Sequence, residues 1–289
     1  MHRRKFLNRA ITVVATLLVG CGGAKKSDHA AAETAEVAEA NAPVMEDGIG
    51  LNEPKDHLTT EPLANAPKPI VAAEDEMKLL RSVGARLNRV SAHIGYGHFN
   101  TIGFDAMRSV AASASKVGKF TSEELDYIEA LFYRDAKDYG FFGRKVSEKL
   151  TETVDPKTVF KVPYSGHYLY KGQSAEVYDQ VKKDIGESIT LTSGVRGIPK
   201  QLQLFLSKTI ECGGNYSEAS RSLAPAGYSY HGIGDFDVGK VGYGERNFTQ
   251  DFEQTHEYEL LTQLGYVAIR YPRGNPFGVY FEPWHVEVV

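Results

Sequence analysis

The sequence predicts an α+β fold in which helices flank an antiparallel sheet. Segments with the composition of strands are short and irregularly spaced, and no repeated βαβ pattern connects them. Neither an internal repeat nor a phosphate-binding loop is evident, since Gly232-Ile233-Gly234 lacks the strand, turn and helix that such a loop needs. These observations favour an α+β domain built on an antiparallel sheet, and they give no sign of a nucleotide-binding site.

Three helices are expected between residues 76 and 154. The first follows from apolar side chains at helical spacing, namely Met77, Leu80, Val83, Leu87 and Val90. Phe104 to Ala114 is the second helix. Thr121-Ser122-Glu123-Glu124 is a capping box that begins the third, which should run to about Lys137. We interpret these helices as packing elements that form an N-terminal helical extension.

Strands and helices mix between residues 155 and 289. The predicted strands are Val159–Pro163, His167–Tyr170, Ser188–Thr192 and Val267–Tyr271, and the predicted helices are Ala175–Asp184, Lys200–Glu211 and Glu257–Leu264. A last strand, formed by Val279–Phe281 and Val286–Val288, is expected to be broken at Pro283, because proline cannot donate to a sheet ladder.

Residues 1–20 have the features of an export signal. Arg3, Arg4 and Lys5 charge its start, and the apolar run from Ala10 to Gly20 is too short for a resident membrane helix. The run ends in Leu18-Val19-Gly20-Cys21, which resembles a lipobox and implies cleavage before Cys21 and lipidation of its thiol. The twin arginines resemble a twin-arginine export signal. We therefore expect an exported protein anchored by lipid in the cell envelope, facing the periplasm or the outer surface.

Residues 21–75 are expected to form a disordered linker behind the lipidated cysteine. The segment holds no aromatic residue after Cys21, is rich in alanine and glutamate, and cannot bury enough apolar surface to order itself. The whole chain has a formal net charge of −4, to which residues 22–75 contribute −7 and the signal +4. Residues 76–289 are left at −1, which gives no electrostatic reason to expect a nucleic-acid partner. Oligomeric state is not predicted.

Metal-ligand side chains gather near the C-terminal end of the sequence. His231 is followed by Asp235 and Asp237, and Glu282 precedes His285 by three residues. A catalytic zinc ion takes three ligands from His, Asp, Glu or Cys and leaves a fourth position open. Glu282 is the candidate general base, because a glutamate that is not a ligand can accept and return a proton. The break at Pro283 would let Glu282 and His285 turn to one side.

Four stretches in order resemble the VanY-type zinc D-alanyl-D-alanine carboxypeptidases. They are Thr192-Ser193-Gly194-Val195-Arg196, then Ala224 to His231, then Asp235 to Gly239, and finally Arg270-Tyr271-Pro272 leading to Glu282-Pro283-Trp284-His285. The resemblance covers about residues 155–289 and implies a Hedgehog/D,D-peptidase fold and one Zn²⁺ ion. It further implies that His231, an aspartate and His285 hold the metal, that Glu282 is the catalytic acid and base, and that Arg196 stabilises the carbonyl oxygen of the scissile bond.

The sequence departs from the family pattern at the aspartate. The usual spacing would place this carboxylate at position 238, which is Val238 here. We favour Asp237 over Asp235, because Asp237 precedes Val238-Gly239 as the family's aspartate often does. In an extended segment both project to the same face, so the other could orient a ligand histidine.

The sequence therefore predicts a lipid-anchored zinc peptidase that removes the terminal D-alanine from peptidoglycan stem peptides. Alternatives are an L,D-carboxypeptidase, a D,D-endopeptidase, or a non-catalytic wall-binding protein of the same fold. Ser193, Ser229 and Tyr230 are candidate substrate contacts, although a turn-forming role for Ser229 and a packing role for Tyr230 are equally compatible with the sequence.

Overall fold

The computed structural model describes residues 68–289. The expected signal, the lipidation at Cys21 and nearly all of the expected linker lie outside these residues and stay predictions. Within residues 68–289, none of the helices has the length and apolar character needed to cross a membrane.

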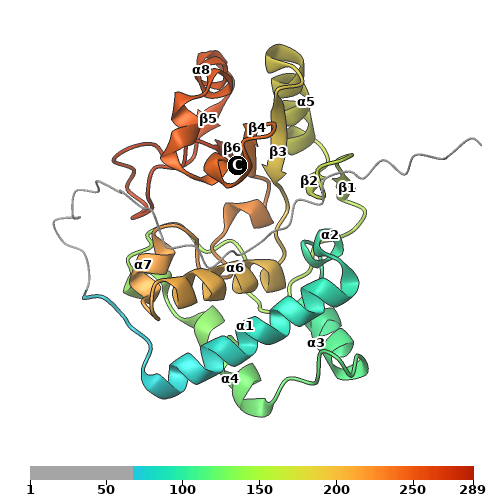
Figure 1. The fold of residues 1–289 in the computed structure, drawn as a ribbon, viewed down its shortest axis with the longest axis vertical. Helices are drawn as coiled ribbons and strands as arrows, with labels where there is room; N and C mark the ends of the chain where they lie inside the picture. Colours follow the sequence, from blue (N-terminus) through green and yellow to red (C-terminus); the bar gives the residue numbers. More distant parts are fainter. Residues whose placement is uncertain (1–67) are drawn as a thin grey trace, which may run out of the picture. The chain divides into compact units, whose positions relative to one another are not determined.

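Helices make up the first part of the described chain (Figure 1). They are α1 (Glu74–Ile94), α2 (Tyr96–Phe99), α3 (Phe104–Ser113), α4 (Ser122–Tyr133) and the 3-10 helix η1 (Ala136–Tyr139). The capping box is confirmed, because Glu124 N–H donates to Thr121 Oγ1 at 3.1 Å and Thr121 N–H donates to Glu124 Oε2 at 2.9 Å. The expected end of this helix near Lys137 was wrong. Asp135 instead accepts a hydrogen bond from Lys137 N–H and begins η1.

The remaining elements build two antiparallel sheets. A hairpin pairs β1 (Val159–Lys161) with β2 (Tyr168–Tyr170). The larger sheet has the order β3-β4-β6-β5, formed by β3 (Ile189–Ser193), β4 (Phe236–Lys240), β6 (His285–Glu287) and β5 (Ala268–Ile269). The helical elements of this part are α5 (Gln173–Ile185), α6 (Ile198–Glu211), α7 (Tyr216–Ser220), η2 (Tyr230–Gly232), η3 (Gly244–Phe248), η4 (Gln250–Gln254) and α8 (His256–Gln263). The prediction of helices with an antiparallel sheet is confirmed.

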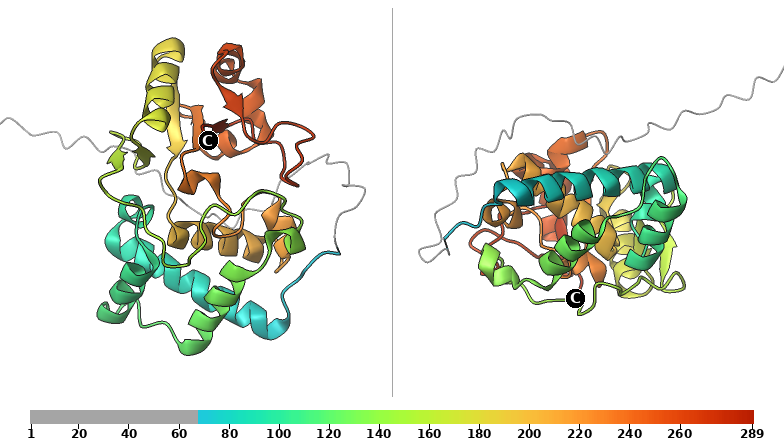
Figure 2. Two further views of the ribbon diagram at one scale, coloured as in Figure 1. Left: turned by 180° about the vertical axis from the view of Figure 1, so that it is seen from behind. Right: turned by 90° about the horizontal axis from the view of Figure 1, so that it is seen from below.

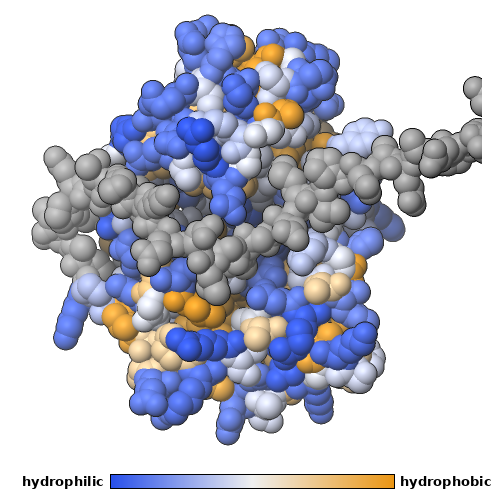
Figure 3. Space-filling view, in the orientation of Figure 1, coloured by the Kyte–Doolittle hydropathy of each residue, from blue (hydrophilic) through white to orange (hydrophobic). Residues whose placement is uncertain are grey.

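The larger sheet has one apolar and one polar face, because side chains alternate along each strand. Leu191 of β3, Val238 of β4 and Val286 of β6 belong to a buried apolar cluster that also takes in residues of α5 and α8. Both helices stand beside the sheet in Figures 1 and 2, and their outer surfaces in Figure 3 are largely hydrophilic. The side chains that follow in alternation, including Asp237 and His285, therefore project from the other face.

A second buried cluster is shared by the helices. It joins apolar residues of α1, α3 and α4 to those of α6 and α7, and α6 lies between α1 and the sheet (Figures 1 and 2). Leu202, Phe205 and Leu206 of α6 are completely buried within it. This hydrophobic core thus runs across the boundary expected at residues 154 and 155, whose placement stays a prediction.

The last strand is shorter than expected, and Val279–Phe281 is not part of it. Only His285–Glu287 pairs as β6. The backbone of the preceding segment is bonded elsewhere, with Tyr280 N–H donating to Arg221 O at 2.8 Å and Val279 O accepting from Asn275 Nδ2 at 2.9 Å. These bonds hold the segment against α7 and leave Glu282 at the entrance to β6.

Candidate metal centre and active site

Asp237 and His285 are neighbours because their strands pair. Asp237 of β4 lies directly opposite His285 of β6, and on its other side it pairs with Ser193 of β3, where the register shifts. The distance from His285 Nδ1 to Asp237 Oδ1 is 3.5 Å. Both side chains are almost fully buried.

His231 reaches the same place from η2. Its Nδ1 lies 2.9 Å from Gly194 O, so this nitrogen carries the proton and Nε2 is left unprotonated. Nε2 lies 3.3 Å from Asp237 Oδ1, and the two histidine ring centroids are 4.7 Å apart. His231 Nε2 and Asp237 Oδ1 are buried, and neither has a hydrogen-bond partner.

These side chains fit a metal ion. One ligand atom each from His231, Asp237 and His285 lies within 4.8 Å of the other two. Two imidazoles and a carboxylate are a donor set that zinc accepts in three-ligand sites. Buried polar atoms without partners are costly in a folded protein, and a cation between them would satisfy both. The structure thus brings together the three residues that the sequence proposed as ligands, with Asp237 rather than Asp235 in the cluster.

Glu282 and Asp235 contact the two ends of the His285 ring. Glu282 Oε2 lies 3.2 Å from Nδ1, and Asp235 Oδ2 lies 3.1 Å from Nε2. Glu282 and His285 turn to one side, as the break at Pro283 predicted. Asp235 occupies the position behind the ring, away from the ligand atom.

Burial and charge set the protonation of these groups. Burial, assisted by Arg196, lowers the pKa of His231 to about 4, so its ring is neutral. Burial would raise the pKa of Asp237, but the positive charge of Arg196 beside its Oδ2 holds the pKa well below its usual range. Burial would lower the pKa of His285, yet hydrogen bonds to Asp235 and Glu282 raise it to about 9. A cation at Nδ1 must therefore displace a proton from His285.

The pKa of Glu282 is shifted upward, whereas the pKa values of Asp235 and Asp237 are shifted downward. Its burial raises the pKa of the carboxyl group, and the hydrogen bond from His285 offsets only part of this effect. A carboxyl group whose pKa is raised toward the working pH is suited to accepting and returning a proton.

Arg196 is held at the edge of the cluster by two side chains. Its Nε donates to Ser193 Oγ at 2.9 Å, and its Nη2 donates to Asp237 Oδ2 at 2.7 Å. Asp237 thus uses one oxygen for Arg196 and keeps Oδ1 for the position between the histidines. Ser193, which the sequence proposed as a substrate contact, orients the guanidinium here.

Ser229 and Tyr230 lie beside the ligand His231, but both are buried. Ser229 begins η2, and its carbonyl accepts from Gly232 N–H at 3.0 Å. Tyr230 Oη accepts from Arg144 N–H at 3.3 Å, and the ring is covered by Arg270. These surroundings match the turn-forming and packing alternatives.

Arg270 is a residue whose place near the site could not be assigned from the sequence. Its Nε and Nη2 bind the two oxygens of Asp235 at 2.8 and 3.1 Å. The only signal for it was its position in the Arg270-Tyr271-Pro272 stretch, which names no partner.

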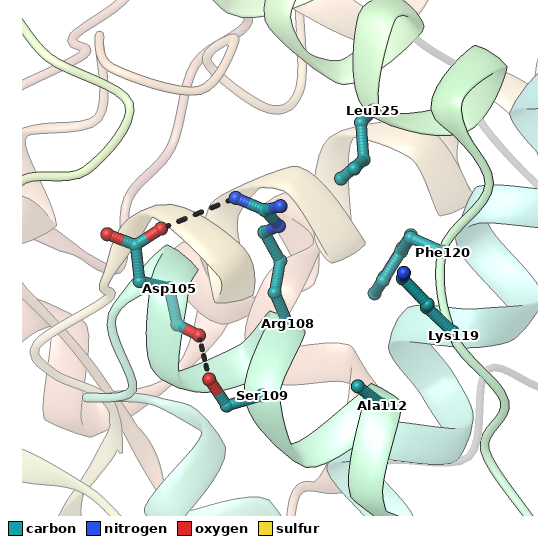
Figure 4. A pocket seen from close by; sticks show the side chains of 7 residues that line it. All are labelled: Asp105, Arg108, Ser109, Ala112, Lys119, Phe120 and Leu125. Atoms are coloured by element: carbon teal, nitrogen blue, oxygen red, sulfur yellow. Dashed lines mark hydrogen bonds and ion pairs between the residues drawn. The ribbon is translucent and has the colours of Figure 1, made fainter.

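A separate pocket of about 300 Å³ lies among α3, α4 and the connection between them (Figure 4). Its lining includes Arg108, Lys119 and Phe120, and Arg108 is paired with Asp105 at 3.6 Å. None of the elements that form it carries a residue of the metal cluster.

The fold and the buried cluster together define a helix-and-sheet protein in which His231, Asp237 and His285 could hold a metal ion. Residues 171–289 match the model of the VanY family, described as D-alanyl-D-alanine carboxypeptidase. The resemblance stated from the sequence is confirmed.

No curated protein matches the chain. Among solved structures, a mutant of the vancomycin-resistance D,D-pentapeptidase VanY in complex with Zn(II) is 20% identical, with 45% of this chain and 78% of that chain covered and a TM-score of 0.34. VanYB in complex with D-alanine-D-alanine is 22% identical, with 50% and 85% covered and a TM-score of 0.36. The resemblance to the VanY family rests on the match of residues 171–289.

Proposed function

We propose that this protein is a zinc-dependent D,D-carboxypeptidase that removes the terminal D-alanine from peptidoglycan stem peptides. The observation that carries the proposal is the convergence of His231 Nε2, Asp237 Oδ1 and His285 Nδ1 beside the buried carboxylate of Glu282. The family match of residues 171–289 supports the substrate class.

The three ligand atoms would hold one Zn²⁺ ion. Zinc in such a site supplies a Lewis acid and lowers the pKa of water to about 7. Glu282 takes the proton of the attacking water at its carboxylate, and it later returns this proton to the departing amine. Its raised pKa brings the proton transfer closer to neutral pH.

Arg196 stabilises the carbonyl oxygen of the scissile bond as negative charge develops on it. Nε and Nη2 are committed to Ser193 and Asp237, which fix the orientation of the planar guanidinium. A cation that is already oriented needs no rearrangement when the charge develops, which is the basis of electrostatic catalysis. Because the same group binds Asp237, it also keeps that carboxylate ionised.

The sequence features before residue 68 support a location for this activity. An export signal in residues 1–20 and a lipobox at Cys21 are compatible with a lipid-anchored enzyme in the cell envelope, exported by the twin-arginine route. A linker after the anchor would let the enzyme reach wall polymer held away from the membrane.

Incubation of the purified chain with defined muropeptides, followed by mass measurement, tests this function. Loss of a single terminal alanine from a pentapeptide, abolished by a chelator and restored by zinc, is the expected result. Cleavage of a tetrapeptide or of a cross-link would instead identify an L,D-carboxypeptidase or a D,D-endopeptidase. A zinc-loaded protein that cleaves none of these substrates would identify a wall-binding protein.

A further inference from the structure

Asp235 accepts hydrogen bonds from three separate parts of the protein. Oδ2 accepts from Arg270 Nε at 2.8 Å and lies 3.1 Å from His285 Nε2. Oδ1 accepts from Arg270 Nη2 at 3.1 Å and from the backbone N–H of Val288 at 2.8 Å. The residue is 1% exposed, so water does not compete for these oxygens.

Arg270 is the group that holds this carboxylate in place. Its backbone N–H donates to His285 O at 3.0 Å, because β5 and β6 pair just before it. Its side chain forms the two-pronged contact with Asp235, pairs with Glu287 at 3.0 Å and donates to Val289 O. The guanidinium also lies 4.2 Å from the centroid of Tyr230, the residue next to His231. Arg270 therefore contacts the segments that carry both ligand histidines.

The consequence for His285 concerns its two ring nitrogens. Nδ1 faces the ligand cluster, 3.5 Å from Asp237 Oδ1 and 3.2 Å from Glu282 Oε2, whereas Nε2 faces Asp235 on the opposite side of the ring. Asp235 therefore keeps Nε2 as a hydrogen-bond donor and turns Nδ1 toward the position of the cation. Asp235 can enforce this only while its own oxygens are fixed, and the planar fork of Arg270 fixes both of them.

We propose that Asp235 and Arg270 act together as positioning residues that make His285 bind the metal through Nδ1. The inference rests on the proposed zinc site, whose three ligand residues include neither Asp235 nor Arg270. The pair acts by fixing the orientation of the His285 ring, so that Nδ1 faces the other two ligands and Nε2 keeps its proton for Asp235 when the metal binds.

Substitutions that keep side-chain size test the pair through metal affinity. Arg270→Lys keeps the positive charge but removes the two parallel guanidinium donors that bind Asp235. Asp235→Asn replaces one of the two accepting carboxylate oxygens with an amide nitrogen, which cannot accept a hydrogen bond. In an assay of zinc affinity by competition with a chelator, each should weaken binding by about 10- to 100-fold, the range found when such partners of ligand histidines are lost. The double variant should be little weaker than the worse single one, because both changes release the same ring.

A second buried pair provides the matched control. Arg86 and Glu124 are joined at 3.0 Å in the helical core, and their side chains are 13% and 2% exposed. Arg86→Lys removes a comparable fork at a place with no connection to the ligands. Its zinc affinity should stay within about twofold of the parent chain, although its melting temperature should fall. Loss of zinc affinity in this control as large as in Arg270→Lys would show a general effect of stability and overturn the proposal.

A measurement on the unaltered protein covers the case in which the variants do not fold. Nitrogen-15 NMR of the zinc-loaded chain reports which ring nitrogen of His285 carries a proton. The expected result is a proton on Nε2 and metal on Nδ1, and the reverse assignment would overturn the proposal. If the chain binds no zinc at all, the proposed function fails; if it binds zinc and hydrolyses peptide while both variants bind zinc as tightly, only this inference fails.

Discussion

His231 and His285 each direct one ring nitrogen toward Asp237 Oδ1, at 3.3 and 3.5 Å, and each is held through its other nitrogen. In His285 the nitrogen that faces Asp237 also lies 3.2 Å from Glu282 Oε2. Gly194 O holds His231 through Nδ1, and Asp235 holds His285 through Nε2. The two histidines thus present different nitrogens to one position. At the scale of single residues, catalysis depends on a group that can accept a proton and return it. Glu282 suits this role because burial raises the pKa of its carboxyl group.

Replacing Glu282 with glutamine should separate metal binding from chemistry. The amide keeps the size of the side chain but cannot accept a proton, so kcat should fall by about 10²- to 10⁴-fold. Zinc content, measured by atomic absorption on the purified variant, should be unchanged because Glu282 is not among the ligands. Activity within a few-fold of the parent chain would rule out Glu282 as the general base.

Arg196→Lys should lower kcat more than it changes KM. Lysine keeps a positive charge but cannot bind Ser193 Oγ and Asp237 Oδ2 together while directing a further donor at the carbonyl oxygen. Loss of an oriented donor of this kind lowers kcat by about 10²- to 10³-fold. Steady-state kinetics on a pentapeptide checks this, and an equal loss in a Ser193→Ala variant would indicate that orientation of the guanidinium matters as much as its presence.

At the scale of secondary-structure elements, Glu124 joins two helices. It completes the capping box at the start of α4 and accepts from Arg86 and Ser82 of α1. Burial would raise the pKa of this carboxyl group, but the hydrogen bonds from Arg86, Ser82 and Thr121 lower it below the ordinary value of 4.5. The ionised form is therefore favoured in the folded state.

The pH dependence of stability follows from this shift. A carboxyl group whose pKa is lower in the folded than in the unfolded protein adds stability above its unfolded pKa, and this contribution is lost as the pH falls through the folded value. Glu124→Gln should therefore cost about 3 kcal/mol at pH 7, the lower end for breaking a buried pair. Urea unfolding at pH 7 and pH 3 should show a smaller difference between variant and parent at the acidic pH. An equal difference at both values would contradict the assignment.

The elements that could be predicted from the sequence are those with a local signal. Apolar spacing predicted α1 within a few residues, and Thr121 with Glu124 marked the start of α4. The helices predicted at Ala175–Asp184 and Glu257–Leu264 also agree with α5 and α8 within a few residues. The prediction of a strand at Val279–Phe281 was wrong, because an apolar and aromatic run does not reveal which segment it will pair with. Its backbone bonds to the end of α7 and not to the sheet. For the site, the ligand types came from spacing, and the preference for Asp237 came from the resemblance to the VanY family. The contact of Asp235 with Arg270 could not be predicted, because it joins residues 35 positions apart through side chains alone.

At the scale of the whole described chain, the family match and the hydrophobic core have different boundaries. The match begins at residue 171, whereas the helical core joins α1, α3 and α4 to α6 and α7. Phe141, Tyr228 and Ala136 form a further small cluster, so the connection after η1 packs against the segment that leads to His231. Ala136 of η1 and Phe141 after it thus pack against the segment that leads to a candidate ligand.

Removal of residues 76–154 should therefore prevent folding of the remaining chain. The apolar face of α6 would be exposed to water, and its fully buried Phe205 touches Tyr139 and Tyr216 with ring centroids 5.9 and 6.2 Å away.

A milder test in the full chain is Phe205→Ala, which should cost about 3 to 5 kcal/mol of unfolding free energy. If α6 couples the helical core to the sheet, circular dichroism in the far and near ultraviolet should report one common transition at lower urea. Separate transitions, or a folded and zinc-binding fragment of residues 155–289, would show instead that the peptidase part is an independent domain and that the helices are an appendage to it.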